Sequence, residues 1–551
     1  MKNYYIFIFT FLFLSIEMNS QALFEKEDYA FSRQDSLRGS NTKERAWWDV
    51  KNYNLNVKIN PLDSSITGFN SITYKVLKEY NIMQIDLQNP LTIDKIIQGK
   101  QVLEYKRDGN VYYVYLRSSQ KLGTTKEICV YYSGKPKTAI NPPWDGGITW
   151  KQDNNGKAFA ATASQGIGAS VWWPNKDQLF DEVESMQINL DVPDHLVGVS
   201  NGRLLKIKNK NNGNKTFRWA VKNPINNYDV CFNIGDYVSF TEKFNGENGS
   251  LNCSYYVLKD NLIQAKEQFK EVSKMLKAFE HWFGPYPFYE DSYKLVETPF
   301  LGMEHQSAIA YGNKFQNGYL GSDLSGTGWG LQFDFIIVHE SGHEWFGNSI
   351  SCKDSADMWI HESFTTYSES LFLEYYYGKD AGDVYNRGIR KNILNDKPII
   401  GTYGVNKEGS SDMYYKGANM LHTLRQIVNN DVKWRTILRG LNTNFYHQTV
   451  TTEQIEDYLN LQVGLDLTSF FNQYLRDSRI PTLEYCFKEN QFGYRWVNCV
   501  PNFNMPVRVT LNGTTKFINP DTNWSYEAMQ SQKNIFKIDD NFYVLELEST
   551  E

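Results

Sequence analysis

The stretch VHESGHEWFGN, at residues 338–348, decides how the rest of the chain is interpreted. It places His339 and His343 four residues apart, with Glu340 directly after the first histidine. Residues four apart lie on one face of a helix, so both imidazoles can bind one metal ion. Glu340 lies about a hundred degrees further round the helix, where a base that activates a zinc-bound water must be. Because the pattern can also arise by chance on an ordinary helix, it needs support from elsewhere in the chain.

A third ligand is expected downstream, because a catalytic zinc has three protein ligands and one open position. Residues 357–369 read DMWIHESFTTYSE, and Glu362 lies nineteen residues after His343. A helix, a turn and a second antiparallel helix would bring Glu362 opposite the histidine pair, completing a site for one Zn²⁺ with His339 and His343. An acidic residue at a solvated helix N-terminus is the alternative reading of Glu362. Glu369, two turns further on the same face, either orients a ligand or lies on the surface.

Length and composition limit the classes of protein to consider. The chain has 551 residues, too many for one hydrophobic core, which predicts several domains. Its apolar content of 41% and charged content of 22% are typical of folded globular proteins. The net charge is −6 and no basic run is present, so nucleic acid is not an expected partner.

The first residues predict a secretory signal peptide over 1–22. Lys2 precedes a mainly apolar run at 6–16, and residues 20–22 offer a small-x-small cleavage site. That run is shorter than the roughly twenty residues that span a bilayer. We therefore expect a secreted or periplasmic protein, with no transmembrane segment in the mature chain.

The spacing of apolar residues predicts a multidomain α+β fold. Alternating strands dominate residues 23–245, which are expected to form an N-terminal antiparallel β domain. A period of three to four then predicts a mainly helical catalytic domain at 246–480, and strand patterns return in a small β-sandwich at 481–551. The helices expected in the middle domain cover 331–346, 362–377, 417–429, 452–461 and 468–475.

The six cysteines are too few for a disulfide scaffold, and none has a CxxC partner for zinc. Cys486 and Cys499 flank a predicted hairpin, where they either pair across the strands or remain free thiols.

The ordered motifs resemble the gluzincin zinc metallopeptidases of the aminopeptidase N and leukotriene-hydrolase type. HEWFGN and WIHESFTTYSE are similar to that family's HExxHxWFGN and WLNEGFAxYxE. FLGMEHQSAIAYG at 300–312 resembles its exopeptidase motif, usually G-x-M-E-N, and YYKGANML at 414–421 resembles its Y-x-K-G segment. The likeness extends over about residues 50 to 500.

The resemblance implies a zinc aminopeptidase whose middle domain is thermolysin-like. In that reading Glu340 activates the water, Glu304 holds the free α-ammonium, and Tyr414 stabilises the oxyanion in preference to Tyr415. The expected substrates are peptides with a free N-terminus, and the oligomeric state is not predicted. The other residues expected to bind substrate are Gly302, Met303 and Gln165.

Four positions depart from the family's motifs. Leu301 replaces a Gly, His305 and His361 each replace an Asn, and Ser363 replaces a Gly. Because the coordination set is already complete, the two histidines are expected to be hydrogen-bond donors around the site and not ligands. The departures leave the pocket's shape and residue preference open.

Two alternatives remain beside the aminopeptidase. A leukotriene-type hydrolase would add epoxide opening to peptidase activity, but that reaction has no separate signature in the sequence. An inactive relative would bind peptides or partners on its β domains. The presence of Glu340, Glu304 and all three expected ligands argues against the inactive relative.

Overall fold

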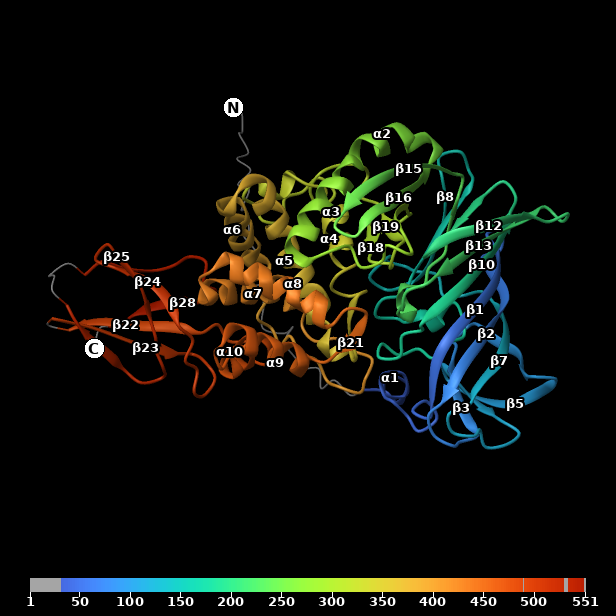
Figure 1. The fold of residues 1–551 in the computed structure, drawn as a ribbon, viewed down its shortest axis with the longest axis horizontal. Coiled ribbons are helices and arrows are strands. Elements are labelled where there is room, and N and C mark those ends of the chain that lie inside the picture. The colour runs from blue at the N-terminus through green and yellow to red at the C-terminus, as the bar shows by residue number, and fades with distance from the viewer. Residues whose placement is uncertain (1–30, 489, 530–533, 550–551) are drawn as a thin grey trace, which may run out of the picture.

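The computed structural model describes residues 31–549 apart from 489 and 530–533. The predicted signal peptide at 1–22 lies outside the described residues. Figure 1 shows N-terminal strands at one end, helices in the centre and C-terminal strands at the other end. This arrangement confirms the predicted multidomain α+β fold class.

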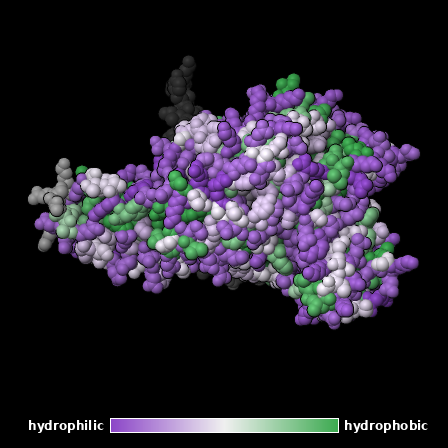
Figure 2. Space-filling view, in the orientation of Figure 1, coloured by the Kyte–Doolittle hydropathy of each residue, from purple (hydrophilic) through white to green (hydrophobic). Residues whose placement is uncertain are grey.

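The face drawn in Figure 2 is mostly hydrophilic, with hydrophobic residues gathered in small groups. Over the described part of the chain, every helix is too short or too polar to span a bilayer.

The N-terminal region is built around a ten-stranded sheet in the order β12-β13-β10-β1-β2-β7-β4-β5-β6-β3. Every second residue of β1, from Tyr53 to Ile59, is buried, so the alternation in the sequence marks the side that faces the core. The strands are β1 (Trp48–Asn60), β2 (Ser65–Val76), β3 (Ile82–Asp86), β4 (Thr92–Gln98), β5 (Gln101–Asp108), β6 (Val111–Tyr115), β7 (Thr125–Gly134), β10 (Ser185–Pro193), β12 (Arg203–Asn209) and β13 (Asn214–Val221).

Two smaller sheets connect this region to the helices. One is a four-stranded sheet in the order β11-β14-β9-β8. Its strand β9 ends two residues before Gln165, one of the residues expected to bind substrate. A five-stranded sheet, β15-β16-β17-β19-β18, takes strands from both sides of residue 245. Their strands are β8 (Gly147–Gln152), β9 (Ala158–Ala163), β11 (Val197–Val199), β14 (Asn233–Gly235), β15 (Tyr237–Gly246), β16 (Gly249–Leu258), β17 (Tyr293–Glu297), β18 (Gly302–Met303) and β19 (Ile309–Tyr311).

The helical region surrounds α5, whose residues from Trp359 to Leu373 are all buried. It also contains a two-stranded sheet of β20 (Ile350–Cys352) and β21 (Gln448–Val450). The helices are α2 (Leu262–Gln268), α3 (Lys270–Phe283), α4 (Phe335–Gly342), α5 (Trp359–Tyr377), α6 (Lys379–Gly388), α7 (Tyr415–Val428), α8 (Asp431–Asn444), α9 (Thr452–Val463) and α10 (Thr468–Leu475).

The helix expected at 331–346 is shorter in the structure, so that prediction was wrong in its extent. α4 begins after Asp334 and its last helical residue is Gly342, which leaves His343 as the C-cap. Beyond it the chain turns back, and the Asn348 N–H donates to the His343 carbonyl at 2.9 Å. Gly347 makes that turn at a φ of 136°, a backbone conformation that side chains disfavour.

The C-terminal region consists of a four-stranded sheet, β26-β23-β22-β28, and a three-stranded sheet, β25-β24-β27. Cys486 lies opposite Gly493 in the β22–β23 pairing, and Cys486 and Cys499 are both free thiols. The strands are β22 (Thr482–Lys488), β23 (Gln491–Val497), β24 (Val507–Leu511), β25 (Thr514–Ile518), β26 (Ser525–Ala528), β27 (Phe536–Ile538) and β28 (Leu545–Glu548).

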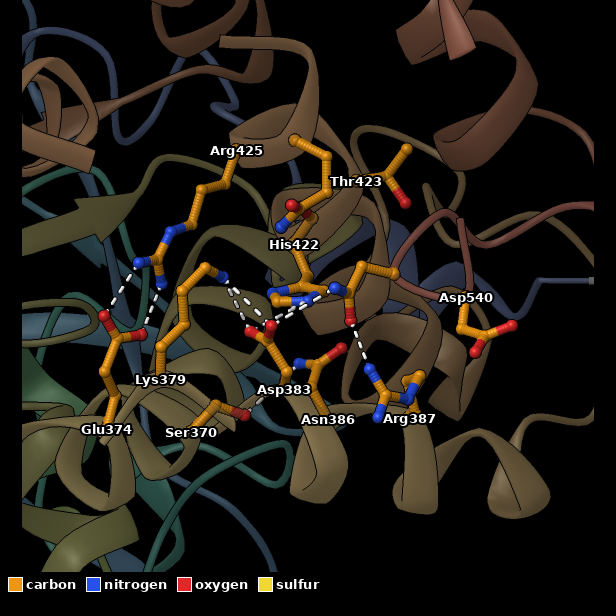
Figure 3. A network of polar contacts seen from close by, with 12 residues as sticks. Ser370, Glu374, Lys379, Asp383, Asn386, Arg387, His422, Thr423, Arg425 and Asp540 are labelled. Carbon is orange, nitrogen blue, oxygen red and sulfur yellow. Dashed lines mark hydrogen bonds and ion pairs between the residues drawn. The ribbon is translucent and has the colours of Figure 1, made fainter. Parts of the chain in front are cut away.

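A polar network joins the C-terminal region to α6. The Asn541 side chain accepts from Arg387 Nη1 at 2.6 Å and donates to Asp383 Oδ2 at 3.1 Å. Lys379 adds an ion pair to Asp383 at 2.9 Å (Figure 3). Since hydrogen bonds to charged groups are stronger than neutral ones, the network holds the C-terminal strands against α6.

Asp334 anchors the beginning of α4 from a fully buried position. Its carboxylate accepts from the backbone N–H groups of Ile336 and Ile337 at 3.1 and 3.3 Å. It also accepts from the Tyr311 hydroxyl at 2.7 Å and from Asn313 at 2.8 Å. One side chain therefore caps the helix and ties it to β19.

Replacing Asp334 by Ala should destabilise the fold, since it removes the cap and leaves buried donors unpaired. We expect a loss of about 2–4 kcal/mol, visible as a lower midpoint of thermal unfolding. The matched control is Asn430→Ala, which removes the exposed cap of α8 and should cost about 0.5–1 kcal/mol. Equal losses in the two variants would contradict this account of Asp334.

Candidate active site

Two imidazoles and one carboxylate converge between α4 and α5. Glu362, in the first turn of α5, places Oε2 at 3.8 Å from His339 Nε2 and 3.4 Å from His343 Nε2. The three ligand atoms lie within 4.8 Å of one another, and all three residues are buried. The structure therefore brings together the three ligands expected from the sequence.

Hydrogen bonds to the other ring nitrogens orient the two histidines. His339 Nδ1 lies 2.7 Å from Glu369 Oε1, and His343 Nδ1 lies 3.0 Å from the Phe346 carbonyl oxygen. Because both partners are acceptors, each Nδ1 carries the proton and each Nε2 presents its lone pair to the site. Glu369 is fully buried, which excludes the surface position considered for it.

The donor set fits zinc in spacing and in chemistry. Bonds of 2.0–2.1 Å in a tetrahedron put neighbouring ligand atoms about 3.3 Å apart, close to the separations between Glu362 and the histidines. Glu362 Oε2 is buried without a hydrogen-bond partner among the described residues, although a carboxylate oxygen there needs one. Two imidazoles and a carboxylate are a ligand set of catalytic zinc sites, so zinc is the metal indicated.

The ligands face a cavity of about 1560 Å³. Glu340 lines it, and no hydrogen bond to another described residue occupies its carboxylate. Glu304 lies on the same wall, where its carboxylate, that of Glu340 and His343 offer atoms within 4.8 Å of one another. Burial raises the pKa of Glu304 to about 8, so its negative charge needs a nearby cation.

Gly302 explains how β18 can pass so close to Glu340. A Cβ atom built on Gly302 would lie 2.8 Å from Glu340 Oε1 and 2.9 Å from an Ile336 methyl carbon. No larger residue fits without displacing Glu340. Met303 also lines the cavity, and the Glu304 backbone is held by Asn348, whose side chain donates to its carbonyl at 2.8 Å.

The two adjacent tyrosines differ in their surroundings, although both line the cavity. The ring of Tyr414 stacks on His339 with 6.1 Å between centroids. Burial, followed by the charge of Glu362, raises the pKa of Tyr414 well above its usual value, so its phenol keeps its proton. Tyr415 is the first residue of α7. Burial, followed by the charge of Glu369, raises the pKa of Tyr415, whereas the carboxylate that acts on Tyr414 is the metal ligand Glu362.

Gln165 reaches the site from the N-terminal region. Its Nε2 donates to Glu362 Oε1 at 3.2 Å, so in this structure it contacts an expected metal ligand. It also lines the cavity, as Glu304 does. The structure places Gln165 on the lining of the cavity, and its contact with substrate stays a prediction.

The histidines that replace the family's asparagines do not act as the sequence led us to expect. His361 Nε2 accepts from the Cys352 N–H at 2.8 Å, and neither nitrogen of His305 has a hydrogen-bond partner among the described residues. Burial lowers the pKa of both imidazoles to about 3, which keeps them neutral. Neither donates to a metal ligand, so their expected role was wrong.

Three residues near the site were missed from the sequence. Tyr385 of α6 donates its hydroxyl to Glu369 Oε2 at 2.5 Å and so extends the chain of bonds behind His339. Trp144 and Glu408 line the cavity from loops of two different regions. None has a motif spacing to the metal ligands, so only the folded chain reveals them.

The buried ligand triad and the carboxylate beside it are the arrangement expected of a zinc metallopeptidase site. The comparisons agree, because residues 267–474 match the profile of the peptidase family M1 domain. This is the family that the motifs of the sequence resemble.

Relatives of known name match this chain at low sequence identity. Endoplasmic reticulum aminopeptidase 1 of Mus musculus is 23% identical over 311 residues, 54% of this chain and 33% of that protein. Aminopeptidase N of Lactobacillus helveticus is 23% identical over 465 residues, 79% of this chain and 51% of the relative. The chain thus spans a third to a half of the length of these relatives.

Solved structures show the same fold. The M1 zinc metallopeptidase of Deinococcus radiodurans has a TM-score of 0.66 at 20% identity, covering 79% of this chain and 94% of that one. A variant of it bound to a Tyr-Ser-Ala substrate has a TM-score of 0.65 at 19% identity, covering 79% and 95%.

Replacing Tyr385 by Phe should weaken zinc binding, because Glu369 would lose the donor that fixes it behind His339. We expect about a 10- to 100-fold loss of affinity, measured by competition with a chelator. The control is Tyr376→Phe, whose hydroxyl donates to the Lys274 carbonyl away from the site. If both variants bind zinc equally well, Tyr385 has no positioning role.

Proposed function

We propose that the protein is a zinc-dependent aminopeptidase that removes N-terminal residues from peptides. The observation that carries the proposal is the position of Glu304, whose carboxylate lies beside Glu340 and His343 within 4.8 Å. A carboxylate at that distance from the reacting centre can pair with a free α-ammonium and so select the end of a chain. The relatives named aminopeptidases and the tripeptide bound to the Deinococcus radiodurans variant support the same substrate class.

The catalytic roles follow from what each side chain can do with a proton or a charge. When bound, zinc would polarise the peptide carbonyl and make a water more acidic. Glu340 is placed to take a proton from the attacking water and to pass it to the leaving nitrogen. The neutral phenol of Tyr414 donates a hydrogen bond to the oxygen on which negative charge develops.

Gly302, Met303 and Gln165 complete the proposed substrate contacts. The strand β18 presents Gly302 and Met303 to the cavity, and the missing side chain at Gly302 lets a peptide approach Glu340. Gln165 offers an amide on the lining of the same cavity. These roles are part of the proposal, as is secretion or export to a periplasm through the signal peptide expected at 1–22.

The proposal is tested with aminoacyl arylamides and their N-acetylated forms. Wild type should hydrolyse the free forms, lose activity on chelation and recover it with zinc. Glu304→Ala should lower kcat/KM by roughly 10- to 150-fold, because a charged hydrogen bond contributes about 1.5–3 kcal/mol. Zinc content of the variant is the control, and efficient hydrolysis of acetylated substrates by wild type would overturn the assignment.

Tyr414→Phe should reduce kcat by about 10²- to 10³-fold, as expected when a donor to the developing oxyanion is removed. KM and zinc content should change little, because only the hydroxyl is lost and the ring still packs on His339. Tyr415→Phe provides the matched comparison one residue away and should lose much less. Steady-state kinetics that fall equally in the two variants would show that the assignment to Tyr414 is mistaken.

A further inference from the structure

Glu408 lies in the loop before α7, on a wall between two cavities. One is the active-site cavity, and the other is a narrow neighbouring cavity. The residues that line both cavities are Gln165, Gly166 and Glu408. A side chain that lies in the active-site cavity against this shared wall can therefore reach the Glu408 carboxylate.

The Glu408 side chain has no polar partner among the residues that the structure describes. It accepts no hydrogen bond and forms no ion pair with any residue in the described part of the chain, and burial raises its pKa to about 7. On the shared wall, a Cβ atom built on Gly166 would lie 3.9 Å from Glu408 Oε1. A half-buried carboxylate without a donor is costly, unless a ligand brings a positive charge to it.

The charges around the cavity favour a cationic ligand. The acidic residues that line the active-site cavity are Glu304, Glu340, Glu362, Glu369 and Glu408, and none of its lining residues is Lys or Arg. The first four already have a part to play, in holding the amine, moving the proton, binding the metal or orienting His339. Glu408 is the carboxylate that remains without one.

The cations of the neighbouring cavity do not neutralise Glu408. Arg38 lies 3.6 Å from Asp177 and donates to the Gly166 carbonyl at 3.0 Å, so its charge is used on the far side of the wall. Lys353 also lines that cavity, but its side chain is exposed to solvent.

Glu408 lines the active-site cavity close to Tyr414, where the carbonyl of a bound peptide is expected. A peptide whose amine lies at Glu304 and whose carbonyl lies near Tyr414 directs that side chain to the remaining wall of the cavity. The charge of Glu408 contributes to the raised pKa of Tyr414, after burial and the charge of Glu362, so the two groups are close.

We propose that Glu408 gives the enzyme a preference for peptides whose first residue is Arg or Lys. The inference rests on the proposed aminopeptidase function, and it assigns to that function a substrate class. It involves no chemical step beyond the hydrolysis already described.

The test compares arginyl and lysyl arylamides with the leucyl and methionyl forms. Wild type should show a kcat/KM at least tenfold higher for the basic residues. In Glu408→Gln the ratio of arginyl to leucyl kcat/KM should fall by about 10- to 100-fold, the range expected for loss of a charged hydrogen bond. Glu408→Lys should lower the same ratio further and raise the relative rate on glutamyl arylamide.

Glu453→Gln is the matched control, because it removes the same charge from an exposed position on α9 and should leave the ratio unchanged. A wild type that prefers leucyl over arginyl substrates would overturn the inference while leaving the aminopeptidase in place. An equal loss on both substrates in Glu408→Gln would also overturn it, since Glu408 would then act on the amine or the fold. Absence of hydrolysis of every free aminoacyl substrate would instead refute the proposed function.

Discussion

The structure depends on one electrostatic constraint, the burial of two imidazoles and a carboxylate between α4 and α5. Each of these groups is costly to remove from water unless it has a partner. The fold supplies acceptors for both Nδ1 atoms and turns both Nε2 atoms toward Glu362. Much of the helical region serves this arrangement, because α5 is enclosed on all sides and Asp334 fixes the beginning of α4.

The fold class and the metal ligands could be predicted from the sequence because their signals are local. Alternation in β1 follows from one buried face, and the spacing of His339 and His343 follows from one turn of helix. Glu362 was within reach because the two helices follow each other closely in the chain. Even so, the extent of α4 was mispredicted, since the turn at Gly347 interrupts a stretch whose apolar spacing still resembles a helix.

Other features depend on contacts between distant segments, which no periodicity records. Tyr385 reaches Glu369 from the next helix, and Glu408 reaches the cavity from a loop with no regular pattern. For the buried histidines the sequence suggested a role that the fold does not give them. His361 was expected to donate a hydrogen bond around the site, but its Nε2 accepts one from the Cys352 backbone N–H. The presence of a histidine next to a metal ligand therefore did not reveal its role, which depends on the groups packed around it.

The polar network between Asn541 and α6 links the C-terminal region to the candidate metal site. The same helix carries Tyr385, so a single rigid element connects the last strands of the chain to the carboxylate behind His339. Shortening the chain at its C-terminal end would therefore loosen α6 and be felt as easier loss of the metal. The terminal strands would then contribute to metal retention without contributing a ligand.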